Sequence, residues 1–198
     1  MKKALFIFVA VIAFLVINSY IPTKKECDIY NSTVRLHVIA NSDSETDQNL
    51  KLRVRDKILE RMSSYNAKTK DEALNYIEND KENLKKIAED CIKENGFDNT
   101  VKIELGEENY PTREYEDFSL PAGKYTSLRI IIGEGSGQNW WCVLYPPLCT
   151  SYAIEYDDPS VDVGFTKEQY NFITGNNKEY KVKFKLLEMA SQAFGFEY

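Results

Sequence analysis

Residues with the chemistry of a cysteine hydrolase occur in this chain of 198 residues. Cys142 is a candidate nucleophile, His37 is the single histidine and a candidate base, and Asn41 or Asn139 could orient the imidazole. Such catalysis needs the thiol and the imidazole within about 3 Å of each other, because the imidazolium lowers the pKa of the thiol. Nothing in the sequence shows that the Cys142 thiol and the His37 imidazole lie this close together. A secreted cysteine hydrolase that uses Cys142 and His37 is therefore the weaker of two functional hypotheses.

Other catalytic signatures are missing from the sequence. The glycines at 133, 135 and 137 do not form the G-x-G-x-x-G pattern of dinucleotide-binding loops, and Ser136 lacks the preceding glycine of a nucleophile elbow. The sequence has no P-loop, H-E-x-x-H or calcium-loop motif. Without a C-x-x-C pair, zinc is a poor explanation for the cysteines. We expect no metal and no cofactor.

The four cysteines offer a second kind of chemistry, a disulfide framework. Cys142 and Cys149 flank a Tyr-Pro-Pro turn that could return the chain on itself, so we predict a bridge between them. Cys27 and Cys91 form a second candidate pair. Two to four buried, reduced thiols are the alternative, because disulfides persist only in an oxidising compartment.

Residues 133–149 also combine the features of a binding site. They read GEGSGQNWWCVLYPPLC and contain both tryptophans and three of the nine glycines. Tryptophan is a favoured anchor because it buries a large area with few rotatable bonds, and Pro146 and Pro147 would stiffen the segment. On a strand, Trp140 and Trp141 must point to opposite faces, so one can enter the core while the other is presented to a partner.

The first 22 residues indicate where such a site would act. Lys2 and Lys3 precede an unbroken apolar run over residues 4–17, the length of a secretory signal rather than of a bilayer span of about 20 residues. We predict a signal peptide or an N-terminal anchor in residues 1–22, and a folded domain in residues 30–198 that faces an extracytoplasmic space. The formal net charge of −6, with basic and acidic residues interleaved, argues against nucleic-acid binding.

The elements that would position the candidate residues follow from hydrophobic spacing. Residues 33–40 alternate apolar and polar side chains, which is the period of a strand with one face in a core. Arg35 and His37 lie on the other face. The loop that ends this strand contains Asn41 and Asp43, and binding residues commonly lie in such loops, so these four residues form a second candidate surface.

Two capping boxes then predict an antiparallel helix pair. Ser44-x-x-Asp47 begins the first helix, Thr69-x-x-Glu72 begins the second, and Asn95-Gly96 ends the second. Apolar residues recur at helical spacing through both segments: Leu50, Val54, Ile58 and Met62 in the first, and Leu74, Ile77, Leu84, Ile87 and Cys91 in the second.

After Gly96 the pattern changes to short strands, predicted around residues 101–105, 125–132 and 140–144. A short helix is expected from Thr166. Residues 181–194 fit both a strand and a helix, and we favour the helix. The expected fold class is α+β, with a single domain, a mainly antiparallel sheet and the pair of N-terminal helices packed on one face.

Two long stretches carry a family resemblance. Residues 34–59, VRLHVIANSDSETDQNLKLRVRDKIL, and residues 120–149, LPAGKYTSLRIIIGEGSGQNWWCVLYPPLC, closely resemble the stage II sporulation protein R family of endospore-forming Firmicutes. Long, non-repetitive strings are far more specific than a short motif, and their order and separation also fit the family.

The resemblance implies a signalling protein rather than an enzyme. Proteins of this family are made in the forespore and exported into the space between the two septal membranes. They are needed to activate a membrane-embedded aspartic-type protease of the mother cell, which matures the precursor of sporulation sigma factor E. We expect this protease as the partner, with membrane contact only through the N-terminal segment. The candidate receptor-binding surface comprises Arg35, His37, Asn41, Asp43, Asn139, Trp140, Trp141, Pro146 and Pro147.

Overall fold

The computed structural model describes residues 21–115, 118–148 and 164–174, together with isolated positions among the first twenty. More than half of the predicted signal or anchor in residues 1–22 therefore lies outside the described residues, and Cys149 and residues 181–194 lie wholly outside them. Within the described part of the chain, no helix is both long and apolar enough to cross a membrane. Backbone contacts divide the chain into two compact units.

The larger unit contains residues 32–108 and 125–166 and is built on a four-stranded sheet with the order β2-β5-β1-β6. These strands span Val101–Tyr110 (β2), Gly123–Ile132 (β5), Val34–Ile39 (β1) and Asn139–Tyr145 (β6). β1 pairs antiparallel with β6 and parallel with β5. A parallel pairing requires a long crossover between its strands, and this chain supplies one through its two long helices. The structure confirms the α+β class and the mainly antiparallel sheet.

The two helices begin where the capping boxes predict. Helix α3 spans Glu45–Met62, and the Ser44 side chain accepts a hydrogen bond from the Asp47 backbone amide at 3.2 Å. Helix α4 spans Lys70–Glu94, and Thr69 caps it in the same way through the amide of Glu72. Each cap satisfies a backbone donor that has no partner inside its helix.

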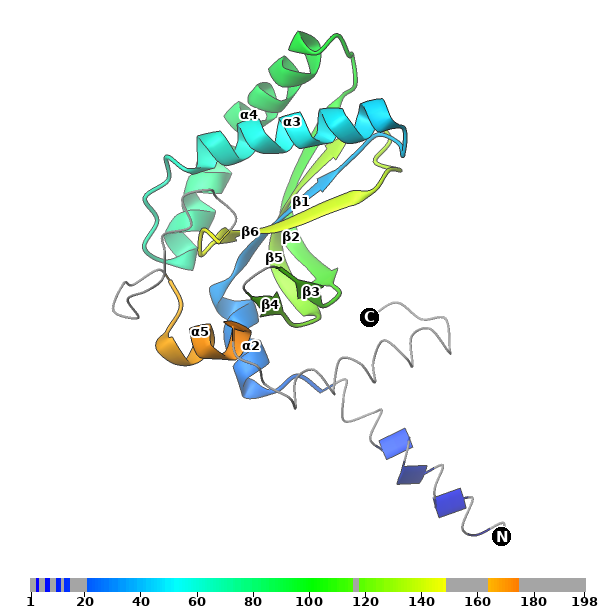
Figure 1. Ribbon diagram of the computed structural model, residues 1–198. Coiled ribbons are helices and arrows are strands. Elements are labelled where there is room, and N and C mark those ends of the chain that lie inside the picture. The colour runs from blue at the N-terminus through cyan, green and yellow to red at the C-terminus, as the bar shows by residue number, and fades with distance from the viewer. Residues whose placement is uncertain are drawn as a thin grey trace. The chain divides into compact units, whose positions relative to one another are not determined.

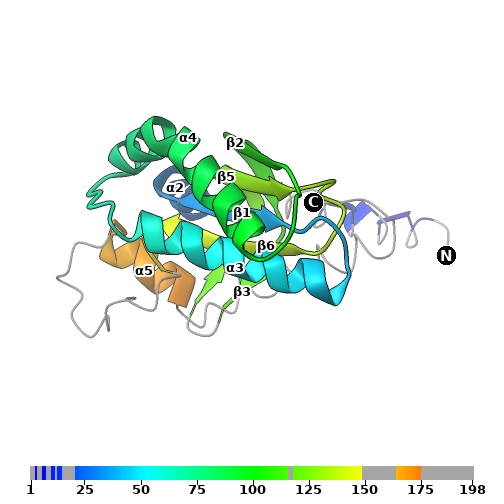
Figure 2. The same cartoon turned by 90° about the horizontal axis from the view of Figure 1, so that it is seen from above.

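One face of the sheet packs against α3 and α4 and forms the hydrophobic core (Figures 1 and 2). Alternate residues of β1, namely Val34, Leu36 and Val38, point into it and are fully buried. Burying one large aliphatic side chain contributes about 1.5–3 kcal/mol, so this layer holds the helix pair on the sheet. Of the predicted helix residues, Leu50, Val54, Ile58, Ile77, Leu84 and Cys91 are buried, whereas Met62, Leu74 and Ile87 are partly buried.

The smaller unit contains residues 1–31, 109–124 and 167–198. Its described elements are α2 (Lys24–Ser32, extending one residue beyond the unit), a two-stranded sheet of β3 (Arg113–Glu114) and β4 (Ser119–Leu120), and α5 (Lys167–Thr174). The Tyr30 hydroxyl donates to the Ala122 carbonyl at 2.7 Å, and a Cβ at Gly123 would lie 2.4 Å from the Tyr30 ring. Helix α5 agrees with the short helix expected from Thr166, whereas α2 was not predicted.

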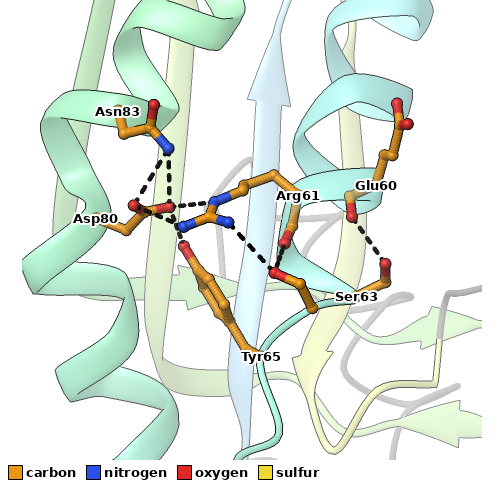
Figure 3. A network of polar contacts seen from close by, with 7 residues as sticks. Glu60, Arg61, Ser63, Tyr65, Asp80 and Asn83 are labelled. Atoms are coloured by element: carbon orange, nitrogen blue, oxygen red, sulfur yellow. Dashed lines mark hydrogen bonds and ion pairs between the residues drawn. The ribbon is translucent and has the colours of Figure 1, made fainter.

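A polar network joins α3 to α4 near the C-terminal end of α3 (Figure 3). The Arg61 guanidinium donates to both carboxylate oxygens of Asp80, at 2.7 and 3.0 Å, and the Tyr65 hydroxyl donates to the same carboxylate at 2.6 Å. We call these three residues the α3–α4 clasp. The hydrogen bond from Arg61 is the largest influence on the pKa of Asp80. With that from Tyr65 it outweighs desolvation and lowers this pKa from 3.8 to about 2.

Replacing Asp80 with asparagine should remove most of the stabilisation that the clasp supplies, about 1 kcal/mol for a partly exposed ion pair. Because folding lowers the pKa of Asp80, this stabilisation is complete above the unfolded value of 3.8 and is lost as the pH falls towards about 2. Urea unfolding midpoints of the wild type and Asp80→Asn should therefore differ at neutral pH and converge in acid. A difference that stays constant down to the lowest pH would contradict a role for the ionised carboxylate.

Candidate functional site

The second face of the sheet carries polar residues, and two of them, Arg35 and His37, are buried. Arg35 is fully buried. Its Nε donates to the Cys142 carbonyl at 2.9 Å, and its guanidinium lies 5.0 Å from the centre of the Tyr125 ring. Because Arg35 is fully buried, its side chain cannot form part of an exposed contact surface, which corrects the expectation for this residue.

His37 lies at the centre of this polar face, where only 5% of it is exposed. Its Nδ1 lies 2.8 Å from Oε1 of Glu108 on β2, and its Nε2 lies 2.8 Å from Oδ1 of Asn139 on β6. Both of these oxygens can accept a hydrogen bond. Burial, the largest single influence, favours a higher pKa for Glu108, but hydrogen bonds with His37 and Ser127 and charge interactions with His37 and Arg129 together lower this pKa. His37 therefore links three strands.

The two tryptophans point to opposite faces of β6, as strand alternation requires. Trp140 is the register partner of Val38, packs against the hydrophobic core, and has the Arg55 guanidinium 4.8 Å from its ring centre. Trp141 is the register partner of His37, and the two ring centres are 5.4 Å apart. Trp141 is half-buried and its neighbour Asn139 is exposed. Trp141 is thus the tryptophan on the polar face.

The loop after β1 is tied to the turn between β5 and β6. Asn41 accepts from the Glu134 backbone amide at 3.0 Å and donates to the Asp47 carboxylate at 2.9 Å. Asp43 accepts from the Gln138 backbone amide at 2.7 Å. Asn41 is half-buried and Asp43 is exposed. Both side chains therefore fix one end of the sheet.

Two residues that support this region were not found from the sequence. Lys51 on α3 is buried and donates to the Gln48 side chain at 2.6 Å and to the Gln138 carbonyl at 2.9 Å, and burial lowers its pKa. Glu108 is the partner of His37, 71 residues away. The sequence did offer a signal for Lys51, because this residue lies at helical spacing from Asp47 and Val54. No local pattern links Glu108 to His37.

The cysteines do not form the catalytic arrangement considered for a hydrolase. Cys142 is disulfide-bonded and buried, and its register partner is Leu36, so it belongs to the helix-covered face. His37 lies on the opposite face. The structure therefore brings His37 and Asn139 together but separates both from the Cys142 thiol, which corrects the hydrolase hypothesis.

The remaining cysteines and prolines are placed as follows. Cys27 and Cys91 carry free thiols, so they do not form the second candidate bridge. Cys149, the partner predicted for Cys142, lies outside the described residues. Pro146 is buried and Pro147 is exposed. Across the described ranges, no group of three or more histidine, cysteine, aspartate or glutamate side chains could hold a metal ion.

Comparisons with known proteins identified one matching family and one similar relative. Residues 30–155 match the family model described as stage II sporulation protein R. Over 123 residues the chain is 34% identical to stage II sporulation protein R of Bacillus subtilis (strain 168), a match that covers 61% of this chain and 55% of that protein. The chain thus matches little more than half the length of this relative. No solved structure matches.

Proposed function

Since this chain belongs to the stage II sporulation protein R family, we propose that its role in sporulation is that of an exported signal. In this proposal the forespore secretes the protein into the space between the septal membranes, where residues 1–22 direct export or anchor it. The protein then activates a membrane-embedded aspartic-type protease of the mother cell. That protease converts the precursor of sporulation sigma factor E to its mature form.

The main support for this proposal is the family match. It runs through residues 30–155 and so includes β1, α3, α4, β2, β5 and β6, the elements that build the sheet and its helix layer. The candidate residues that come together on this framework favour recognition over catalysis. His37, Asn139 and Trp141 form a connected polar and aromatic group, while the one cysteine considered as a nucleophile is disulfide-bonded.

An activator of this kind must bind the active form of its receptor more tightly than the inactive form, because only differential affinity shifts an equilibrium. Trp141 and Asn139 are suited to supply that contact. They lie next to the turn that Asn41 and Asp43 hold in place, so little conformational entropy would be lost when a partner binds. His37 supports Trp141 from the neighbouring strand.

Deletion of the gene in its endospore-forming host tests the proposal. The precursor of sigma factor E should remain uncleaved in sporulating cells of the deletion strain, and a copy of the wild-type gene should restore cleavage. Immunoblotting of the precursor and mature forms measures both results. Normal cleavage in the deletion strain would refute the proposed function.

A further inference from the structure

Lys51 on α3 is a buried charge beside the turn that precedes β6. Only 5% of the residue is exposed. Its ammonium donates to Oε1 of Gln48 at 2.6 Å and to the Gln138 carbonyl at 2.9 Å, and both acceptors are neutral oxygens. Lysine is seldom buried without a charged partner, because removing an ammonium from water is costly. An apolar side chain of similar length would fill this position at a lower cost.

The pKa of Lys51 reflects this cost. Burial is the largest influence and lowers the pKa, and the nearby Arg55 guanidinium lowers it further, whereas the Asp43 carboxylate raises it. The net shift is downward, so the attraction of Asp43 does not offset burial and the like charge of Arg55. Residues that break a local rule of stability in this way are expected at functional sites.

The hydrogen bonds of Lys51 join α3 to two loops at one end of the sheet (Figure 1). Nε2 of Gln48 donates to the Ser42 carbonyl in the loop after β1 at 2.8 Å, while its Oε1 accepts from Lys51. The Asp43 carboxylate, next in the chain to Ser42, accepts from the Gln138 backbone amide at 2.7 Å. A closed polar ring results, which we call the Lys51 ring and which consists of Ser42, Asp43, Gln48, Lys51 and Gln138.

Both backbone hydrogen-bonding groups of Gln138 are held within this ring. Its amide donates to Asp43, and its carbonyl accepts from Lys51. These two groups belong to the two planar peptide units on either side of the Gln138 Cα, so holding both restricts φ and ψ of this residue. β6 begins at the next residue, Asn139, and Trp141 follows on the same face of the strand. The Lys51 ring therefore sets the direction in which β6 begins.

We infer that Lys51 is a positioning residue of the signalling surface, because it fixes the Gln138 backbone and so the orientation in which Asn139 and Trp141 are presented. This inference rests on the proposed function, which takes these two residues as the contact with the partner. Lys51 is buried and acts through Gln138. A contact that is held in place loses less conformational entropy on binding, so release of Gln138 weakens binding even where the fold is unchanged.

Lys51→Met separates positioning from stability, because methionine has a similar length and no ammonium. The loss of two hydrogen bonds is opposed by the removal of a buried charge, so the urea unfolding midpoint should stay close to that of the wild type. Hydrogen–deuterium exchange of the full chain in lipid nanodiscs, followed by mass spectrometry, should become about tenfold faster over residues 134–141, as expected for one lost hydrogen bond. Exchange over residues 84–92 of α4 should not change.

Lys57→Met is the matched control, because it removes an exposed lysine from the same helix. Its exchange should equal that of the wild type over both ranges. Unchanged exchange over residues 134–141 in Lys51→Met would overturn the inference. Equal acceleration over residues 84–92 would also overturn it, since that result indicates a general loss of stability. If Lys51→Met does not fold, Lys51→Gln, which is shorter and uncharged, takes its place in these measurements.

The same variants test signalling in cells. Lys51→Met should reduce cleavage of the sigma-factor precursor about tenfold at matched protein level, because a smaller fraction of the protein holds the binding conformation. Lys57→Met should cleave normally. Normal cleavage with a folded Lys51→Met protein would overturn the inference. If the deletion strain itself cleaves the precursor, the proposed function fails, and the exchange experiment alone decides whether Lys51 positions Gln138.

Discussion

Gly137→Ala should destabilise the protein by about 3 kcal/mol, near the upper end for an overpacked site. A Cβ at this position would lie 2.2 Å from the Ser42 carbonyl oxygen and 2.5 Å from its carbon. Both are backbone atoms, so no flexible side chain can move aside. The loop is also fixed by a hydrogen bond from the Gly137 amide to the Ala40 carbonyl at 3.0 Å. Relief of the clash would separate the loop after β1 from the turn before β6.

Gly106→Ala provides the matched control for this substitution. Gly106 lies within β2, and a Cβ there would meet nothing within 4 Å. Alanine should be neutral or stabilising by about 0.5–1 kcal/mol at such a position, because glycine loses more backbone entropy on folding. Urea unfolding midpoints of the full-length proteins measure both effects. Equal midpoints for Gly137→Ala and the wild type would show that the two loops are not in close contact.

Trp141→Ala should reduce cleavage of the sigma-factor precursor by about 30-fold, the effect of losing an interface anchor worth about 2 kcal/mol. The ring is half-buried on the polar face and contacts His37, so its removal takes away surface that the proposed partner would bury. Trp141→Phe should retain much of the activity, because an aromatic ring remains beside His37. Cleavage is measured by immunoblotting at matched protein levels.

Trp140→Ala is the control that distinguishes the loss of a core residue from the loss of an interface anchor. Trp140 packs against the hydrophobic core and under Arg55. The main effect of Trp140→Ala should therefore be a loss of stability of about 3 kcal/mol. Trp141→Ala should unfold closer to the wild-type midpoint. Wild-type cleavage in a stably folded Trp141→Ala protein would eliminate Trp141 as the contact residue.

The parts of the fold that depend on local interactions could be predicted from the sequence. The caps at Ser44 and Thr69 satisfy backbone donors only three residues away. The alternation of apolar and polar residues in β1 predicts which of its side chains face the core. The parallel neighbour of β1 could not be predicted, because two helices and three other strands separate β5 from β1 in the chain. Strand order depends on how distant segments pack, and no periodicity encodes it.

The candidate site, too, could be predicted only in part from the sequence. Alternation along β6 correctly placed Trp140 and Trp141 on opposite faces. Alternation along β1 failed for Arg35, because a polar residue on the second face of a strand reads as exposed, whereas this side chain is fully buried and its Nε donates to the Cys142 carbonyl. Glu108 could not be predicted as the partner of His37, since only the order of the strands brings these residues together.

Reconstitution in a bacterium that does not form spores tests the proposed function most directly. The full chain, the membrane-embedded protease and the precursor of sigma factor E are produced together, and the mature form is quantified by immunoblotting. The mature form should accumulate only when this chain is present, and it should fall strongly with Trp141→Ala. Equal cleavage with and without the chain, or no cleavage with all three proteins present, would contradict its role as the activator.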